Sequence, residues 1–209
     1  MRYLTFALTK GRLARQTLAL LEQVGITCEE MKDTDSRKLI FVNEELKLKF
    51  FLAKGPDVPT YVEYGAADIG VVGKDILMEA GSDIYELLDL NTGCCRMAVA
   101  APKGYVNDPD SDLRVATKFT NVAREYYASM GRDIDIIHLN GSIELAPILG
   151  LSDVIVDLVE TGTTLRENNL EVIEEIAQIS ARLISNKSSF KFKNKQIEEI
   201  AGKMAEQIK

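Results

Sequence analysis

The chain has 209 residues, with 25 lysine and arginine residues against 32 aspartate and glutamate residues, for a net charge of −7. Hydrophobic residues make up 46% and charged residues 27%, which is ordinary for folded domains and excludes a disordered chain, a collagen-like chain or a disulfide scaffold. The acidic balance argues against nucleic-acid binding, which needs a basic surface, but it leaves open small polyanionic ligands held by a few local cations.

Three cysteines, Cys28, Cys94 and Cys95, are an odd number and favour reduced thiols over disulfide bonds. Residues 1–8 form only a short apolar stretch before Lys10, and no run approaches the ~18 apolar residues of a membrane span. A cytoplasmic protein without a membrane segment is therefore expected.

The hydrophobic spacing of the first part of the chain predicts alternating strands and helices. In chain order these are a strand at 3–8, a helix at 13–24, a hairpin of strands at 39–42 and 46–50, a short helix at 59–64, a strand at 69–72 and a helix at 76–80. Gly25 and Gly81 mark the ends of the first and last of these helices.

A second set of similar elements follows residue 93. It consists of strands at 96–100, 113–116, 134–139 and 154–156, with helices at 121–130 and 142–149. Strands that alternate with helices predict an α/β fold with mainly parallel sheets, here in two lobes with a cleft between them. Residues 170–184 fit either a strand or a helix, of which we favour the strand, and the apolar residues between Ile197 and Ile208 form one helical face.

Asp157 and the segment Thr161-Gly162-Thr163-Thr164, called here the Thr/Gly loop, form the most site-like pattern. Asp157 directly follows the apolar strand 154–156, and open α/β sheets bind ligands at the carboxyl ends of their strands. Threonine hydroxyls and exposed backbone N–H groups around a glycine suit a phosphate, while a carboxylate can accept hydrogen bonds from ribose hydroxyls. The alternative is a threonine-rich helix cap after a buried strand.

Lys10, Gly11 and Arg12 stand between the first strand and the first helix, and Arg15 follows one turn later. Cations beside a glycine at such a junction can bind anionic oxygens, although a solvated basic helix start explains them equally well. His138, the only histidine, lies in an apolar strand and is expected in the core. Adjacent Cys94 and Cys95 do not have the separation of zinc ligands, and the sequence has no P-loop or Gly-Xaa-Ser-Xaa-Gly elbow.

The spacing of Glu144, Gly150, Ser152, Ile155, Asp157 and the Thr/Gly loop with Leu165 resembles the signature of the ATP phosphoribosyltransferases, the first enzymes of histidine biosynthesis. Other matching segments cover nearly the whole chain, at residues 8–12, 36–40, 57–63, 67–70, 73–75, 116–118, 121–124 and 180–184. The length resembles that of the family's short form, which lacks the C-terminal regulatory domain of the long form.

This resemblance implies a two-lobed fold like that of periplasmic binding proteins. Residues 1–91 and 181–209 then form a discontinuous first lobe, and residues 92–180 form a second lobe that carries the Thr/Gly loop. It also implies a homodimer that assembles with a regulatory subunit resembling histidyl-tRNA synthetase, as a hetero-octamer.

The implied reaction transfers the 5-phosphoribosyl group of phosphoribosyl pyrophosphate to N1 of the adenine of ATP, and releases pyrophosphate. The residues that the signature assigns to phosphoribosyl pyrophosphate are Glu144, Asp157, Thr161, Gly162, Thr163, Thr164 and Leu165. Those assigned to ATP are Lys10, Gly11, Arg15, Lys54 and Asp75, although many relatives have arginine in place of Lys54. Arg12 and Arg37 are the implied catalytic residues, with Arg37 acting across a subunit boundary. Mg²⁺ is expected on the substrate phosphates, without a dedicated protein site.

Two other functions fit parts of the pattern. A two-lobed small-molecule binding module without catalysis would share the fold, since a fold does not determine a function. Another phosphoribosyltransferase would also place a carboxylate before a Thr/Gly phosphate loop, but such enzymes usually have two adjacent acids there, whereas Leu158 follows Asp157.

Overall fold

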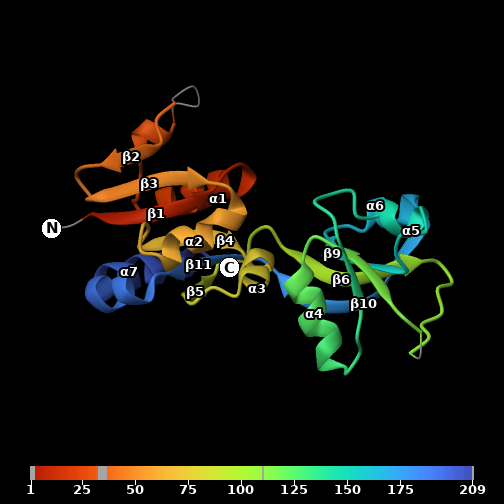
Figure 1. The fold of residues 1–209 in the computed structure, drawn as a ribbon. Helices are drawn as coiled ribbons and strands as arrows, with labels where there is room; N and C mark the ends of the chain where they lie inside the picture. Colours follow the sequence, from red (N-terminus) through yellow and green to blue (C-terminus); the bar gives the residue numbers. More distant parts are fainter. Residues whose placement is uncertain (1–2, 33–36, 110, 209) are drawn as a thin grey trace. The chain divides into compact units, whose positions relative to one another are not determined.

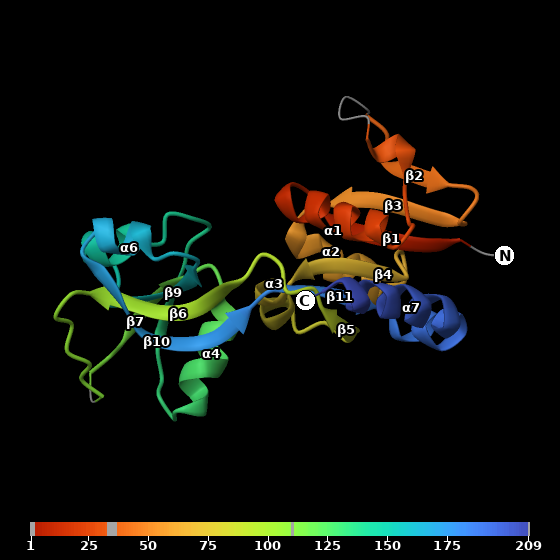
Figure 2. The ribbon, with the colours of Figure 1, turned by 180° about the vertical axis from the view of Figure 1, so that it is seen from behind.

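The computed structural model describes residues 3–32, 37–109 and 111–208, and its contacts divide the chain into two units. The first unit comprises residues 1–93 and 180–209, and the second comprises residues 94–179. Each unit contains one sheet with helices packed on it (Figures 1 and 2). Among the described residues, no helix is long and apolar enough to cross a membrane.

The sheet of the first unit has the strand order β2-β3-β1-β4-β11-β5. Its strands are β1 (Leu4–Thr9), β2 (Ile40–Asn43), β3 (Leu48–Ala53), β4 (Ile69–Gly73), β5 (Tyr85–Asp89) and β11 (Ala181–Ser185). Its α-helices are α1 (Arg12–Gln23), α2 (Val58–Glu63), α3 (Lys74–Ala80) and α7 (Lys187–Gln207), and short 3₁₀ helices span Glu29–Met31 and Gly55–Asp57.

The core of this unit lies on both faces of β1, because side chains along a strand point alternately to either side. Leu4, Phe6 and Leu8 join the cluster under α1 and α7, where the rings of Phe6 and Phe50 stack with centroids 4.9 Å apart. Ala7 faces the opposite way, into the cluster under α2. Burial on both faces explains why the consecutive residues Phe6, Ala7 and Leu8 are all apolar.

The sheet of the second unit has the order β10-β6-β9-β7-β8. Its strands are β6 (Cys95–Pro102), β7 (Arg114–Thr117), β8 (Asp135–His138), β9 (Val154–Val159) and β10 (Leu170–Ile179). Its helices are α4 (Thr120–Ser129), α5 (Leu145–Ile148) and α6 (Thr163–Glu167). Alanines 98, 100 and 116 share a core cluster with residues of α5 and α6, so these helices pack against the small side chains of the sheet.

The predicted α/β fold is confirmed, but the sheets are mixed rather than mainly parallel. The pairs β1–β3, β1–β4, β7–β8 and β7–β9 are parallel. The pairs of β2, β5, β6, β10 and β11 with their neighbours are antiparallel. The antiparallel pairs are the β2–β3 hairpin, the β6–β9 pair and the pairs that β10 and β11 form with their neighbours.

The strand favoured for residues 170–184 is confirmed, and it consists of two strands that belong to different sheets. β10 ends at Ile179 and β11 begins at Ala181, with Ser180 between them. The Ser180 hydroxyl donates to Asp89 Oδ1 at 2.7 Å, and Arg182 forms an ion pair with the same carboxylate at 2.8 Å. Asp89 closes β5, a strand that the hydrophobic spacing did not predict.

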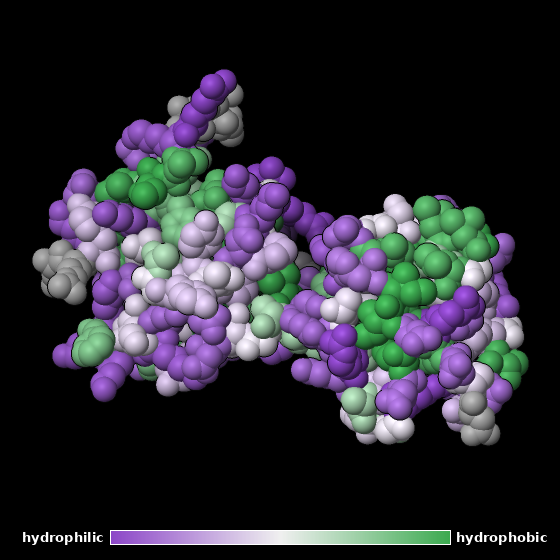
Figure 3. Space-filling model, in the orientation of Figure 1, coloured by the Kyte–Doolittle hydropathy of each residue, from purple (hydrophilic) through white to green (hydrophobic). Residues whose placement is uncertain are grey.

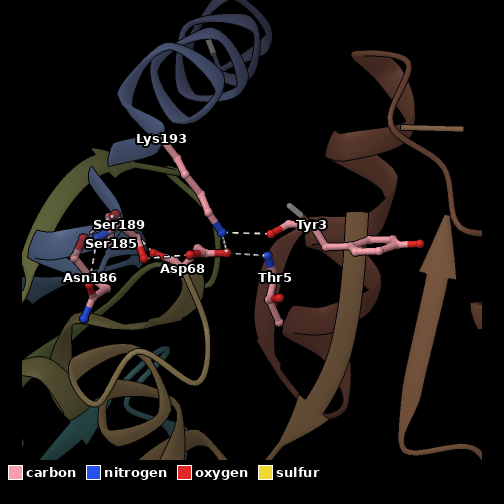
Figure 4. Close-up of polar contacts among 7 residues, drawn as sticks. All are labelled: Tyr3, Thr5, Asp68, Ser185, Asn186, Ser189 and Lys193. Carbon is pink, nitrogen blue, oxygen red and sulfur yellow. Dashed lines mark hydrogen bonds and ion pairs between the residues drawn. The ribbon is translucent and has the colours of Figure 1, made fainter. Parts of the chain in front are cut away.

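Helix α7 is held to the first sheet by the buried carboxylate of Asp68 (Figure 4). Asp68 Oδ2 accepts from the Lys193 ammonium at 2.7 Å and from the backbone N–H of Thr5 at 2.8 Å, while Oδ1 accepts from the Ser189 hydroxyl at 2.6 Å. Lys193 is also where the helix kinks, with a non-helical φ of −123°. The predicted C-terminal helix is therefore present, but it begins ten residues before Ile197.

Candidate functional site

A polar pocket of about 260 Å³ opens in the second unit, beside strands β6 and β9. Ala98 and Ala100 of β6 lie directly opposite Asp157 and Ile155 of β9 and form part of its lining. The other lining residues are Glu144 and the continuous segment from Leu158 to Leu165. The small alanine side chains leave the space that a larger residue would fill, so the carboxylates and the Thr/Gly loop surround an open volume.

Asp157 lies in this pocket, but it stands within β9 rather than after it, because the strand continues to Val159. Its Oδ1 accepts a hydrogen bond from the backbone N–H of Leu158 at 2.8 Å. Burial raises the pKa of Asp157 above the ordinary aspartate value, and the charge of Glu144 raises it further. The Leu158 N–H and the charge of Lys118 act on this pKa in the opposite direction.

Glu144 immediately precedes the short helix α5 and is half-buried in the same pocket. The helix is shorter than the predicted 142–149, since residues 142–144 form a turn. Glu144 and Asp157 are 13 positions apart in the sequence and come from different elements, yet both line the same pocket. The pocket therefore combines two carboxylates with a loop of donors.

The Thr/Gly loop follows β9 and continues into the first turn of α6, which begins at Thr163. Gly162 has φ +71°, a left-handed conformation that glycine adopts without steric cost. The hydroxyls of Thr161 and Thr163 lie 3.0 Å apart, and the backbone N–H of Thr163 is 3.4 Å from Thr161 Oγ1. Leu165, by contrast, buries its side chain in the core and can offer a ligand only its backbone.

Arg166 is a residue of this loop region that the sequence analysis missed. Its guanidinium donates to the Thr161 carbonyl at 2.9 Å and to Thr163 Oγ1 at 3.0 Å. The signal was available in principle, because residues three apart lie on one face of a helix, and Thr163 and Arg166 are both in α6.

In the first unit, several of the predicted site residues lie at the carboxyl edge of the sheet. β1 and β3 are parallel with Thr9 opposite Ala53, so Lys10 and Lys54 follow them at the same edge. Asp75 follows the neighbouring parallel strand β4, in the first turn of α3. A Cβ on Gly55 would lie 2.7 Å from Ile76 and 3.5 Å from Thr9, which shows how closely these three segments meet.

The remaining predicted site residues of the first unit, which are Gly11, Arg12, Arg15 and Arg37, are exposed. Gly11 has φ +94° and precedes α1, which begins at Arg12, with Arg15 one turn later. Arg37 is exposed ahead of β2, and Ser36 beside it lies outside the described residues. The structure therefore brings Lys10, Lys54 and Asp75 to one edge, while it places Arg37 on a different element, with no described contact to that edge.

In the described part of the chain, neither His138 nor a metal-binding cluster belongs to these sites. His138 is exposed at the end of β8, which corrects its expected place in the core, because the edge strand β8 has only one neighbour. Within the described ranges, no group of three or more histidine, cysteine, aspartate or glutamate side chains is arranged to hold a metal ion.

Comparisons of the sequence and of the structure with known proteins point to one family. A family model described as ATP phosphoribosyltransferase matches residues 54–206. The chain is 59% identical over 210 residues to a protein named ATP phosphoribosyltransferase from Lachnoclostridium phytofermentans, with 99% of this chain and 97% of that protein covered. It is 38% identical to a chain of the solved structure "ATP phosphoribosyl transferase (HisG:HisZ) complex from Thermotoga maritima", with a TM-score of 0.85 and 98% of each chain covered.

A more distant likeness concerns the fold alone. The alkanesulfonate-binding protein SsuA from Xanthomonas axonopodis pv. citri has a TM-score of 0.55 to this chain at 14% identity, with 98% of this chain and 72% of that protein covered. The predicted likeness to periplasmic binding proteins is therefore confirmed at the level of the fold.

Proposed function

Because the chain belongs to the ATP phosphoribosyltransferase family, we propose that its second unit binds phosphoribosyl pyrophosphate and its first unit binds ATP. As a transferase of this family, it catalyses the first step of histidine biosynthesis. The 5-phosphoribosyl group passes from phosphoribosyl pyrophosphate to N1 of the adenine of ATP. The observation that carries the assignment of the second unit is the pocket in which two carboxylates face a loop of hydroxyl and N–H donors.

In this pocket, Asp157 and Glu144 accept hydrogen bonds from the two ribose hydroxyls. Thr161, Gly162, Thr163 and Thr164 surround the 5-phosphate with hydroxyl and backbone donors, which suits an anion better than water can once the donors are fixed. Leu165 contributes its backbone N–H, because its side chain belongs to the core. The small side chains of Ala98 and Ala100 leave room for the sugar ring.

ATP binds at the carboxyl edge of the first sheet, through Lys10, Gly11, Arg15, Lys54 and Asp75. The positive φ of Gly11 lets the backbone approach phosphate oxygens closely, and Lys10 and Lys54 supply charge from adjacent strands. Lysine at position 54 donates as a point charge, without the two-pronged contact that arginine makes.

The chemistry is a displacement at the anomeric carbon of the ribose. The lone pair of adenine N1 forms the new C–N bond, the C–O bond to pyrophosphate breaks, and its electron pair leaves with the pyrophosphate. Arg12 and Arg37 stabilise the negative charge that develops on the leaving group. Arg37 acts in this way on a neighbouring copy of the chain, so that the active enzyme is at least a homodimer.

The carboxylate oxygens in the pocket fit Mg²⁺ that arrives with the substrate. Asp157 and Glu144 are hard oxygen ligands, and Mg²⁺ is commonly held by one or two carboxylates together with substrate phosphates. Bound there, the ion would supply positive charge that offsets the charge of the pyrophosphate. No described side-chain cluster offers a complete protein cage.

We place the chain in a cytoplasmic hetero-oligomer with a regulatory subunit that resembles histidyl-tRNA synthetase. The similar Thermotoga maritima structure is a complex of two different proteins by its title. Leu145, Ile148, Leu149 and Leu151 are exposed around α5, and Figure 3 shows apolar side chains gathered on this unit. Exposed apolar surface of this kind supports an assembled state.

The direct test is to mix the purified chain with ATP, phosphoribosyl pyrophosphate and Mg²⁺, and to measure pyrophosphate release and the mass of the nucleotide product. Reactions with and without the candidate regulatory subunit, and a control without ATP, separate transfer from hydrolysis. ATP-dependent release with a phosphoribosylated nucleotide supports the proposal. Binding of both ligands without turnover in either preparation would favour the alternative, a two-lobed binding module.

A further inference from the structure

The guanidinium of Arg166 lies against the Thr/Gly loop, although it does not line the pocket. Besides its bonds to the Thr161 carbonyl and Thr163 Oγ1, it would lie 3.3 Å from a Cβ on Gly162. The backbone of the same residue donates to the Gly162 carbonyl at 3.1 Å. One residue therefore contacts three consecutive members of the loop.

The positive charge of Arg166 offsets the negative charge of the residues that line the pocket. The described lining residues include three carboxylates, of Glu144, Asp157 and Glu160, and no lysine or arginine. A phosphate group carries nearly two negative charges at neutral pH, so these carboxylates oppose its binding. The positive charge of Lys118 lowers the pKa of Asp157, whereas Arg166 donates hydrogen bonds to the Thr/Gly loop itself.

The hydrogen-bond directions add a second effect. A guanidinium only donates, so Thr163 Oγ1 must accept from Arg166. One hydroxyl proton of Thr161 and Thr163 lies between their oxygens, 3.0 Å apart, and the other remains for a further acceptor. The Thr161 carbonyl, which would repel an anion, is likewise occupied by Arg166. A hydroxyl that already accepts from a cation becomes a better donor. The contacts thus prepare the loop as a surface of donors.

We propose that Arg166 is a positioning residue for the 5-phosphate: it fixes the Thr/Gly loop from behind and directs the threonine hydroxyls into the pocket. The inference rests on the proposed function and names a residue of that site which the family signature does not assign. Arg166 does not touch the reacting atoms, so its loss weakens binding of the 5-phosphate and leaves the chemical step intact.

The test compares the Arg166→Met and Arg166→Lys variants with the wild-type chain, in the presence of the regulatory subunit if activity requires it. Arg166→Met should raise the KM for phosphoribosyl pyrophosphate about tenfold, which corresponds to about 1.4 kcal/mol. It should leave kcat and the KM for ATP within about twofold, as expected when ground state and transition state lose the same interaction. Arg166→Lys keeps the charge and should recover part of the loss.

Two inhibitors distinguish positioning of the phosphate from a general collapse of the pocket. Ribose 5-phosphate should lose affinity for Arg166→Met by the same factor as the substrate, whereas pyrophosphate should bind as it does to the wild type. Equal losses for both inhibitors would show a merely structural role and overturn the inference.

The control variants are Glu167→Gln, on the neighbouring residue of α6, and Lys103→Gln, which removes one positive charge from an exposed position in the same unit. Both should leave the KM for phosphoribosyl pyrophosphate unchanged. A KM within twofold of wild type in Arg166→Met would also overturn the inference, provided that Asp157→Asn raises it. Unaltered behaviour of Asp157→Asn as well would mean that the proposed pocket itself is wrong.

Discussion

Asp157 is placed where burial and function act against each other. Its pKa is raised because the carboxylate is largely removed from water, so the ionised form that accepts ribose hydroxyls is unfavourable in the free protein. Because the pKa of Asp157 is higher in the folded than in the unfolded protein, this difference contributes fully to the free energy of unfolding at low pH. This contribution is lost as the pH rises through the folded-state pKa. At neutral pH, Asp157 therefore lowers the free energy of unfolding.

Asp157→Asn should for this reason weaken the binding of phosphoribosyl pyrophosphate without lowering Tm. The loss of a charge-assisted hydrogen bond costs roughly 1.5–3 kcal/mol, or about 10- to 150-fold in KM. The amide oxygen can still accept from the Leu158 N–H, and the buried charge is gone, so Tm should stay constant or rise. Kinetics and thermal unfolding at neutral pH provide the check, and an unchanged KM would contradict the role of Asp157.

The same carboxylate predicts a pH profile. As the pH falls, the KM for phosphoribosyl pyrophosphate should begin to rise at a pH above the ordinary aspartate pKa, because a protonated Asp157 accepts hydrogen bonds less well. This acid limb should be absent from Asp157→Asn. Its persistence in the variant would assign the titration to another group.

Gly162 gives a second prediction at the residue scale, with a matched control in the same unit. Gly162 and Gly131 have φ of +71° and +70°, so a valine strains the backbone similarly at either position. A Cβ on Gly162 meets Arg166 at 3.3 Å, whereas one on Gly131 meets no described atom within 4 Å. Gly162→Val should abolish activity, and Gly131→Val should only lower Tm. Full activity in a folded Gly162→Val protein would move the phosphate site elsewhere.

At the scale of the elements, α7 depends on the ion pair between Lys193 and Asp68. These side chains are only 24% and 10% exposed, and Lys193→Met leaves the buried carboxylate without its cation. Because Thr5 and Ser189 still donate to Asp68, the expected cost is about 1–3 kcal/mol in the free energy of unfolding.

Lys203→Met on the same helix is the control for this prediction. Lys203 and Glu199 are 50% and 63% exposed, and such surface pairs contribute about 0–1 kcal/mol. Urea titrations of both variants should show a larger loss for Lys193→Met. Equal stabilities would show that the Asp68 network does not anchor α7.

Most strands and helices were predictable, because α1 repeats apolar residues at helical spacing, whereas β1, β4 and β9 are mostly apolar runs of strand length. β5 was not, since the acidic residues of Tyr85–Asp89 leave it partly exposed at the edge of the sheet. The β2–β3 hairpin and the parallel pairs were predicted, but the antiparallel pairs of β5, β6, β10 and β11 were not, because a strand's own sequence does not encode whether its neighbour is parallel.

The same reasoning limits what the sequence showed of the site. The pattern of Asp157 and the Thr/Gly loop indicated a ligand site, since residue types and local spacing carry that signal. The resemblance added Glu144, which is 13 positions from Asp157. Arg166 was not predicted, because its role depends on the direction in which its side chain points from the five-residue helix α6.

At the scale of the whole molecule, the account predicts where histidine acts. Feedback requires a histidine site that is coupled to the catalytic site through two states of the assembly. We expect this effector site in the assembly with the regulatory subunit. A histidine titration should therefore leave the activity of the isolated 209-residue chain nearly unchanged and inhibit the mixture with that subunit. Strong inhibition of the isolated chain would place the histidine site on this chain rather than in the assembly.

The central claim is that the second unit binds phosphoribosyl pyrophosphate through two carboxylates and the Thr/Gly loop. An experimental structure of the chain with this substrate and Mg²⁺ tests it most directly. The account predicts ribose hydroxyl oxygens within about 2.5–3.0 Å of Asp157 and Glu144, and the 5-phosphate within hydrogen-bond distance of residues 161–164. A substrate whose 5-phosphate instead lies beside Lys10 and Lys54, with the Thr/Gly loop empty, would contradict it.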